Sequence, residues 1–243
     1  DPTVFPSLLR FENEVVEMAR HHLRGGPDVV GNFTSGGTES CMLAVKTARD
    51  FYRAARGVER PQMVLPVTAH AAFHKAASYF DVEKVLVPVR GGDYRADVEA
   101  MAAAITDRTV LLVASAPSYA HGCVDPIPEI GALALEHDLL FHVDACIGGV
   151  LLPLFRDLGE PVPEFDLRLP GVSSIPMDLH KYGFTPYGAS VVLYRDRALR
   201  KHQLFTCAHR PGYTVVNPSL PTTQSGGPVP AALAVTRLLG RAV

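Results

Sequence analysis

The stretch Met177-Asp178-Leu179-His180-Lys181-Tyr182-Gly183 places a lysine directly after an Asp-x-His triplet. Strand-like segments flank it, with residues 172–175 before it and the apolar run 189–194 after it. This position predicts a lysine at the edge of a strand rather than on a solvated helix face. A lysine amine held there is a candidate nucleophile that forms a Schiff base with an aldehyde. Alone, the pattern also fits an ordinary loop lysine, so the interpretation depends on partners elsewhere in the chain.

Strand-like and helix-like segments alternate through the middle of the chain. The strands are expected at 63–67, 84–89, 109–114 and 139–143, and the helices at 71–80, 97–105 and 127–137. The strands are almost continuously apolar, which is typical of a mostly parallel sheet covered on both faces. We therefore predict an α/β fold with three layers, α/β/α, in which ligands bind beyond the carboxyl ends of the strands.

Helical patterns also lie near both ends of the sequence. Apolar residues recur at helical spacing over 8–23, and Gly25-Gly26-Pro27 ends this run, while a last helix is expected over 231–243 after an irregular loop, 211–228. We expect an N-terminal helical segment, 1–28, followed by one large domain, 29–243. Because the first helix follows Asp1-Pro2-Thr3 so closely, we also expect that flanking segments are missing from the sequence.

A glycine turn connects the strand-like residues 29–34 to a long helical pattern that includes 42–52. Gly36 and Gly37 allow a close backbone approach, and Ser35 and Thr38 add hydroxyl groups next to the free N–H groups of a helix N-terminus. This combination predicts a phosphate site. An ordinary N-cap, with Ser35 or Thr38 capping the helix, explains the same residues without a ligand.

Polar side chains follow three of the predicted strands. His70, Ser115 and Asp144 each stand at or just past the carboxyl end of a strand. A carboxylate at the end of a buried strand requires a cationic partner, for which a protonated pyridine nitrogen and an arginine are both candidates. Asp144 as a helix N-cap and His70 as a histidine bonded to the backbone remain alternatives.

Composition excludes several classes of protein. The 243 residues carry a net charge of −2 with lysine and arginine spread along the chain, so no nucleic-acid or lipid surface is expected. No apolar run approaches the ~20 residues of a membrane span. The four cysteines are far apart, which indicates neither a disulfide framework nor a zinc site and fits a cytoplasmic location. His142 and Asp144 lack a third ligand at a supporting spacing, so no metal is expected.

Taken together, these motifs resemble the sphingosine-1-phosphate lyase branch of the group II decarboxylases that depend on pyridoxal 5'-phosphate (PLP). These enzymes have the aspartate aminotransferase fold (fold type I). The matching stretches are 34–40 (TSGGTES), 68–73 (TAHAAF), 116–117 (AP), 121–122 (HG), 125–126 (DP), 142–149 (HVDACIGG) and 178–183 (DLHKYG). They follow the family's order and cover nearly the whole chain.

The resemblance implies a role for each candidate residue. Lys181 forms the Schiff base with PLP, Asp144 pairs with the pyridinium nitrogen, and His70 stacks on the ring. The remaining cofactor contacts are assigned to Ser35, Gly36, Gly37 and Thr38 at the phosphate, His180 beside it, and Ser115 at the phenolic oxygen. The resemblance thus implies that the cofactor is held from several sides, in a site built at a homodimer interface.

The resemblance also implies an activity, which is cleavage of a β-hydroxy amine into an aldehyde and an amine at the bond between its α and β carbons. An amino acid decarboxylase uses the same residues, so it remains the alternative, and a non-catalytic protein of the PLP fold is a third possibility. The group that takes the hydroxyl proton is open among Tyr119, Tyr182 and Tyr213. The family further implies a homodimer, an N-terminal segment and a C-terminal small domain.

Two positions depart from the family pattern. The family has a Pro-Lys-Gly step where this chain has Pro186-Tyr187-Gly188, and a Ser-Arg-x-Gly-Gly step where this chain has Thr223-Gln224-Ser225-Gly226-Gly227. Two cationic side chains are therefore replaced. If they recognise an anionic substrate, this protein is expected to prefer another amine or to bind the same one more weakly.

Overall fold

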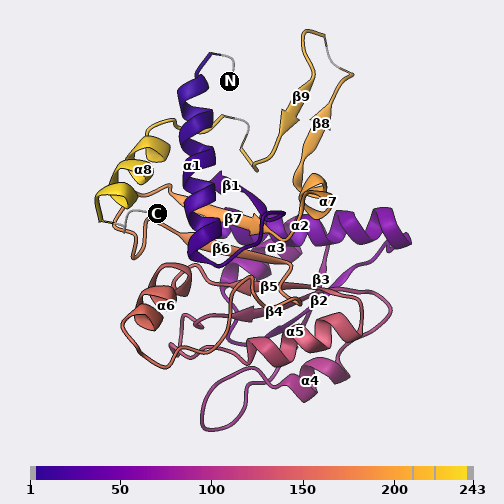
Figure 1. The fold of residues 1–243 in the computed structure, drawn as a ribbon. Helices are drawn as coiled ribbons and strands as arrows, with labels where there is room; N and C mark the ends of the chain where they lie inside the picture. The colour runs from indigo at the N-terminus through magenta and orange to yellow at the C-terminus, as the bar shows by residue number, and fades with distance from the viewer. Residues whose placement is uncertain (1–3, 210, 222, 240–243) are drawn as a thin grey trace.

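A seven-stranded sheet forms the centre of the computed structural model, which describes residues 4–209, 211–221 and 223–239 (Figure 1). The order across the sheet is β1-β7-β6-β5-β4-β2-β3. The strands are β1 (Val30–Thr34), β2 (Gln62–Pro66), β3 (Glu83–Val87), β4 (Thr109–Ser115), β5 (Leu140–Asp144), β6 (Ser174–Asp178) and β7 (Ser190–Tyr194). β7 is antiparallel to both neighbours, and the other pairs are parallel. The strands other than β7 therefore end at one edge.

Helices cover both faces of this sheet. They are α1 (Pro6–His22), α2 (Gly37–Arg56), α3 (Ala71–Phe80), α4 (Val98–Ala103), α5 (Ile127–Glu136), α6 (Gly148–Asp157), α7 (Arg197–Arg200) and α8 (Pro228–Leu239). α2 and α3 pack on one face in one apolar cluster, while α1, α4, α5, α6 and α8 contribute to the cluster on the other face. This arrangement confirms the predicted three-layer α/β/α fold.

Burial along the strands explains why the sequence pattern was readable. Every residue of β4 is buried, as expected for a central parallel strand with a helix layer on each side. β3, at the edge, exposes Glu83 and Lys84, whose charges suit an unpaired edge. The continuous apolar runs in the sequence therefore mark the inner strands of the sheet.

The end of β6 differs from the prediction. The strand-like segment was expected over 172–175, but β6 runs over Ser174–Asp178, so Asp178 is its last residue and Lys181 lies in the turn that follows. The strand continues because β6 pairs residue by residue with β7, from Ser174 opposite Tyr194 to Asp178 opposite Ser190. That pairing is not visible in the local composition.

The loop predicted at 211–228 is partly wrong. Its first part belongs to a hairpin of β8 (Phe205–Cys207) and β9 (Val215–Asn217), which extends away from the sheet in Figure 1. Strands of three residues carry too little alternation to be recognised by pattern.

The two terminal helices lie against each other. In α1, Val15 and Ala19 are buried in the same apolar cluster as Val229 and Ala232 of α8. α8 spans Pro228–Leu239, and residues 1–3 and 240–243 of the predicted ends lie outside the described residues. The division of the chain at residue 28 stays a prediction. None of the described helices is both long and apolar enough to cross a membrane.

A buried histidine gives the fold a testable pH dependence. His142 in β5 is fully buried, with Nδ1 2.8 Å from the hydroxyl oxygen of Ser174, and burial lowers the pKa of His142 to about 3. In the unfolded chain the same ring takes up a proton near its ordinary pKa of about 6.5. The unfolded state therefore binds more protons as the pH falls, and stability is lost.

From pH 7 to pH 5 we expect His142 to reduce the free energy of unfolding by about 2 kcal/mol. Denaturant titrations of the native protein and of His142→Gln at both pH values measure this contribution of His142 to the free energy of unfolding. The variant should lose about 2 kcal/mol less than the native protein over this range. An equal loss in both proteins would show that His142 is not held neutral in the fold.

Candidate active site

A cavity of about 430 Å³ opens beyond the carboxyl ends of β4, β5 and β6, against the N-terminus of α2. It brings together all nine predicted site residues: Ser35, Gly36, Gly37, Thr38, His70, Ser115, Asp144, His180 and Lys181. Other lining residues include Glu39, Tyr119, Cys146, Asp178 and Tyr187. The predicted residues therefore lie around one cavity, although they come from positions more than 140 residues apart in the sequence.

The N-terminus of α2 forms one wall of this cavity. Gly36 is the N-cap residue with φ 153°, and no side chain caps the helix. The first N–H groups of a helix have no acceptor within it, so the start of this 20-residue helix offers donors and a positive dipole end to an anion. This geometry fits a phosphate. Neither Ser35 nor Thr38 caps the helix with its side chain, so the N-cap alternative is not observed.

Glu39 fixes the loop before this helix. Its Oε2 accepts hydrogen bonds from the backbone N–H and the hydroxyl of Ser35, both at 2.7 Å, and its Oε1 accepts the backbone N–H of Leu220 at 2.8 Å. The Ser35 hydroxyl is therefore engaged by Glu39, whereas Thr38 is exposed at the cavity. Glu39 was not singled out for this position in the sequence, because its partner near residue 220 is distant along the chain.

Gly37 is required by close packing. A Cβ atom added to it would lie 2.5 Å from Oδ2 of Asp178 and 2.6 Å from Sγ of Cys146, both too short for any real contact. The absence of a side chain therefore lets the start of α2 approach the ends of β5 and β6. The two adjacent positions require glycine for different reasons: Gly36 has a positive φ, and Gly37 has close contacts that leave no space for a Cβ.

Asp144 ends β5 with its carboxylate next to the cavity. The residue is 8% exposed, and Oδ1 accepts the backbone N–H of Cys146 at 3.1 Å. Ser115 of β4 lies beside it in the sheet register. A carboxylate in this setting has room for a further cationic partner from within the cavity.

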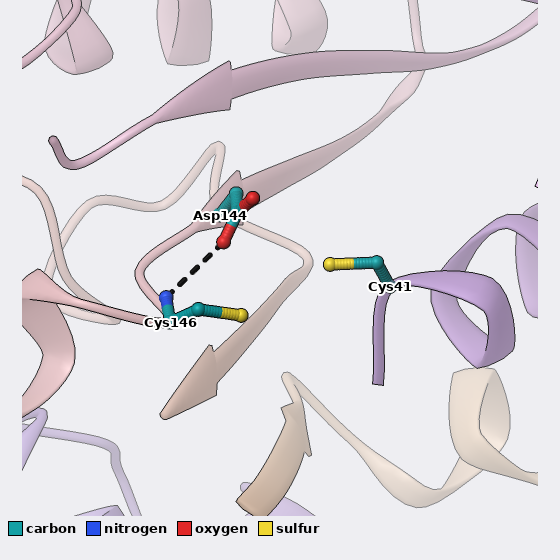
Figure 2. A group of neighbouring side chains, drawn as sticks. All are labelled: Cys41, Asp144 and Cys146. Carbon is teal, nitrogen blue, oxygen red and sulfur yellow. Dashed lines mark hydrogen bonds between the residues drawn. The ribbon is translucent and has the colours of Figure 1, made fainter. Parts of the chain in front are cut away.

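Cys41 and Cys146 bring their sulfur atoms close to this carboxylate (Figure 2). The ligand atoms of Cys41, Asp144 and Cys146 all lie within 4.8 Å of one another. The hydrogen bond with Cys146 lowers the pKa of Cys41, but burial and the carboxylates of Asp144 and Asp178 outweigh it and raise this pKa to about 11. The hydrogen bond to Cys41, burial and Asp144 raise the pKa of Cys146 well above its usual value. Both groups are therefore neutral thiols near pH 7.

Lys181 points its amine at the same cavity. Its Nζ lies 3.0 Å from Oδ2 of Asp178, a residue that is 1% exposed. Burial lowers the pKa of Lys181, but Cys146, the Asp178 carboxylate bonded to Nζ and Asp144 outweigh it and raise this pKa. Asp178 was quoted in the sequence but not recognised as a site residue, because β6 was expected to end before it.

Two histidines are held by backbone contacts. His70 caps α3, with its Nδ1 accepting the backbone N–H of Ala72 at 3.1 Å, and its side chain is exposed at the cavity. The Nδ1 of His180 accepts the backbone N–H of Ala189 at 3.2 Å. Both ring orientations are therefore set before any ligand binds. His70 therefore both bonds to the backbone and lines the cavity, so the two interpretations offered for it from the sequence hold together.

The residues around the cavity fit PLP. The α2 N-terminus suits its phosphate, Asp144 suits a protonated ring nitrogen, and Lys181 offers the amine for its aldehyde. A single cavity with these three kinds of group defines a PLP-binding domain of fold type I.

Comparison with known proteins agrees with this class. The family model for the pyridoxal-dependent decarboxylase conserved domain matches residues 3–213, so the chain belongs to that family, and its cofactor is PLP. The chain is 45% identical to sphingosine-1-phosphate lyase of Arabidopsis thaliana over 242 residues, covering 98% of this chain and 44% of that protein. It is 44% identical to the lyase of Dictyostelium discoideum over 233 residues, covering 96% of this chain and 44% of that protein.

A solved structure gives the same result. The sphingosine-1-phosphate lyase of Burkholderia pseudomallei superposes with a TM-score of 0.96 at 40% identity, covering 98% of this chain and 56% of that chain. The predicted fold, cofactor and resemblance are thereby confirmed. The chain spans less than half the length of the two curated relatives above.

The contacts of Gly37 lead to a testable prediction. We expect Gly37→Ala to lower the free energy of unfolding by about 1–3 kcal/mol, because its Cβ would displace Asp178 and Cys146. It should also weaken PLP binding, since the helix N-terminus would move from the strand ends. Gly26→Ala is the matched control, because a Cβ there meets no atom within 4 Å. Equal stability of the two variants in denaturant titrations would contradict the close packing.

Proposed function

We propose that this chain is the cofactor-binding part of a PLP-dependent carbon–carbon lyase of the sphingosine-1-phosphate lyase kind. Such an enzyme cleaves a β-hydroxy amine at the bond between its α and β carbons and releases an aldehyde and an amine. The observation that carries the proposal is the grouping of Lys181, Asp144 and the α2 N-terminus around one cavity. The 45% identity to a named lyase supports this activity over the decarboxylase alternative.

Each residue has a proposed task. Bound PLP supplies an aldehyde that links to amines and a ring that takes up the electron pair of a breaking bond. The Nζ of Lys181 provides the amine that holds the cofactor between turnovers. Asp144 would keep a proton on the ring nitrogen, and the exposed ring of His70 would stack on the cofactor ring. His180, whose ring is oriented by the backbone N–H of Ala189, would lie beside the phosphate.

The remaining contacts complete the cradle. The backbone N–H groups of Gly36 and Gly37 and the Thr38 hydroxyl would hold the phosphate, with Ser35 positioned by Glu39 at its side. Ser115, buried at the end of β4, would face the phenolic oxygen. Held at both ends, the cofactor ring would keep one orientation relative to Lys181, which favours one reacting geometry.

Tyr119 is the proposed acceptor of the hydroxyl proton. Of the three tyrosines considered, it lines the described cavity, and its ring lies edge-on to His70 with centroids 6.2 Å apart. Tyr182 and Tyr213 are not among the described residues that line it. The Tyr119 side chain is 77% exposed, so it can move towards a bound substrate.

The decarboxylase alternative differs in the bond that breaks, and the same Lys181 and Asp144 would serve it. A non-catalytic protein of this fold would bind PLP through the same groups.

We further propose that the whole protein works as a homodimer in the cytoplasm. The projecting hairpin exposes the apolar residues Phe205 and Val216, which supports an interface between two chains. The cysteines of the described chain are free, which supports the cytoplasm.

The absorption spectrum with added PLP tests the cofactor role of Lys181. We expect the native protein to develop a band near ~420 nm that disappears on borohydride reduction, because the lysine amine links to the aldehyde. Lys181→Ala should show no such band, while Lys84→Ala, which removes an exposed lysine of β3, should keep it. A band that persists in Lys181→Ala would refute the assignment.

Product analysis then separates the activities. Incubation of the PLP-loaded protein with β-hydroxy amines and with amino acids should release an aldehyde from the former and no carbon dioxide from the latter. Release of carbon dioxide without aldehyde would favour the decarboxylase. A stable PLP band with neither product would favour the non-catalytic protein.

Tyr187 tests the substrate preference. Its side chain lines the cavity at the position where the family has a lysine, whereas Gln224 is not among the lining residues. We expect Tyr187→Lys to improve the affinity for a phosphorylated over an unphosphorylated β-hydroxy amine by about fivefold, equivalent to about 1 kcal/mol from one exposed ion pair. Tyr187→Gln is the uncharged control. Inhibition constants of both amines measure the change, and equal ratios in the two variants would contradict it.

A further inference from the structure

Asp178 is a buried carboxylate with one close cationic partner among the described residues. Its Oδ2 lies 3.0 Å from Nζ of Lys181, and its Oδ1 is buried without a hydrogen-bond partner in the described part of the chain. The residue is 1% exposed, whereas the Lys181 side chain is 35% exposed at the cavity. The pair therefore has a fixed, buried anion and a more mobile, partly solvated cation.

The surrounding backbone holds this carboxylate in place. Asp178 closes β6 opposite Ser190 of β7, and its backbone N–H donates to the carbonyl of Cys146 at 3.3 Å. Gly37 packs directly on the carboxylate from the other side, where any larger residue would collide with both of its oxygens. Because strand and helix confine it, the carboxylate cannot turn away to follow Lys181.

Such an anion requires its cation. A carboxylate removed from water is strongly unfavourable unless it is paired. The nearest other base is His180, whose Nε2 is 3.8 Å from Oδ2, beyond hydrogen-bonding distance. The other ionisable groups around the cavity include Asp144 from β5, Cys146 after it, Cys41 and Glu39 from α2, His70 at the start of α3, Tyr119 and Tyr187. Lys181 is thus the partner that the geometry provides for Asp178.

We propose that Asp178 is a positioning residue that keeps the Lys181 amine protonated and directed into the cavity whenever this amine is not linked to another group. The inference rests on the proposed function for the identity of Lys181 as the nucleophile. A lysine must lose a proton before it attacks a carbonyl group. At 3.0 Å, Asp178 Oδ2 pairs with the Nζ atom that carries this proton and holds the amine in place until the proton leaves.

This arrangement differs from common ways of activating a lysine. A nucleophilic lysine is often kept neutral by desolvation or by a neighbouring cation. Here burial opposes the charge, but Cys146 and the carboxylates of Asp178 and Asp144 outweigh it and raise the pKa of Lys181. The free amine is thereby stored as an ammonium, paired with Asp178.

The pH profile of Lys181 labelling in the PLP-free protein tests this role. Acetic anhydride reacts with the neutral amine, so the pH midpoint of labelling reports the ionisation of each lysine, read by mass spectrometry of peptides. In Asp178→Asn we expect the Lys181 midpoint to fall by about one pH unit or more. The exposed Lys84 in the same sample is the internal reference and should not shift.

Asp144→Asn serves as the matched variant, because it removes a carboxylate of the same cavity that does not bond to Nζ. Its Lys181 midpoint should shift less than that of Asp178→Asn. An unchanged midpoint in Asp178→Asn, or an equal shift in both variants, would overturn the proposal. A merely structural role of Asp178 would not move the midpoint of Lys181 selectively.

A stability comparison covers the case in which Asp178→Asn folds poorly. Lys181→Met leaves the buried carboxylate unpaired, so its melting temperature at pH 7 should lie below that of the double variant Lys181→Met/Asp178→Asn. A double variant that is no more stable than Lys181→Met would overturn the pairing. The tests also separate the two proposals, because labelling needs no cofactor. If the midpoint shifts but no PLP band forms, the function fails and the Asp178 role stands.

Discussion

The contact between the start of α2 and the ends of β5 and β6 is the constraint on which the whole site depends. Gly37 lets the helix backbone lie directly against Asp178 and Cys146, at distances that leave no space for a Cβ. This contact places the positive end of a long helix within the same cavity as the strand-end carboxylates. A wider approach would separate the helix N-terminus from these carboxylates.

Charge at the site is arranged on two neighbouring strands. β5 and β6 each end in a buried carboxylate, Asp144 and Asp178 respectively. Lys181 is committed to Asp178, whereas Asp144 receives one backbone N–H, from Cys146. One anion is thus matched by Lys181, and the other has capacity left for a cation that the described residues do not supply. This difference in pairing suits the two carboxylates of one cavity to different tasks.

The sequence was sufficient to predict the layers of the fold and the nine candidate site residues around the cavity. Parallel strands bring their carboxyl ends to one edge, so polar residues such as His70, Ser115 and Asp144 could be grouped from their positions alone. What could not be predicted depended on pairing across the chain. Asp178 became visible as a site residue only once β6 was extended by its register with β7, and the three-residue strands β8 and β9 exist because of each other.

The same limit applies to hydrogen bonds with one distant partner. Glu39 binds Ser35, four residues earlier, and also the backbone of Leu220, 181 residues away. The first contact belongs to a local motif at a helix start, and the second belongs to tertiary structure. Sequence patterns describe the first kind well, which is why the glycine turn was located correctly while the occupation of the Ser35 hydroxyl by Glu39 was not foreseen.

The position of β7 has a consequence for how the protein is made. In the sheet, β1 pairs with β7 and with no other described strand, although the two are separated by 160 residues, from Thr34 to Tyr194. During synthesis, β1 and the glycine turn after it therefore cannot join the sheet until β7 has been made. At a synthesis rate of about 5–20 residues per second, this interval lasts on the order of 10 to 30 seconds. During translation the turn after β1 therefore emerges well before the strand that holds β1 in the sheet.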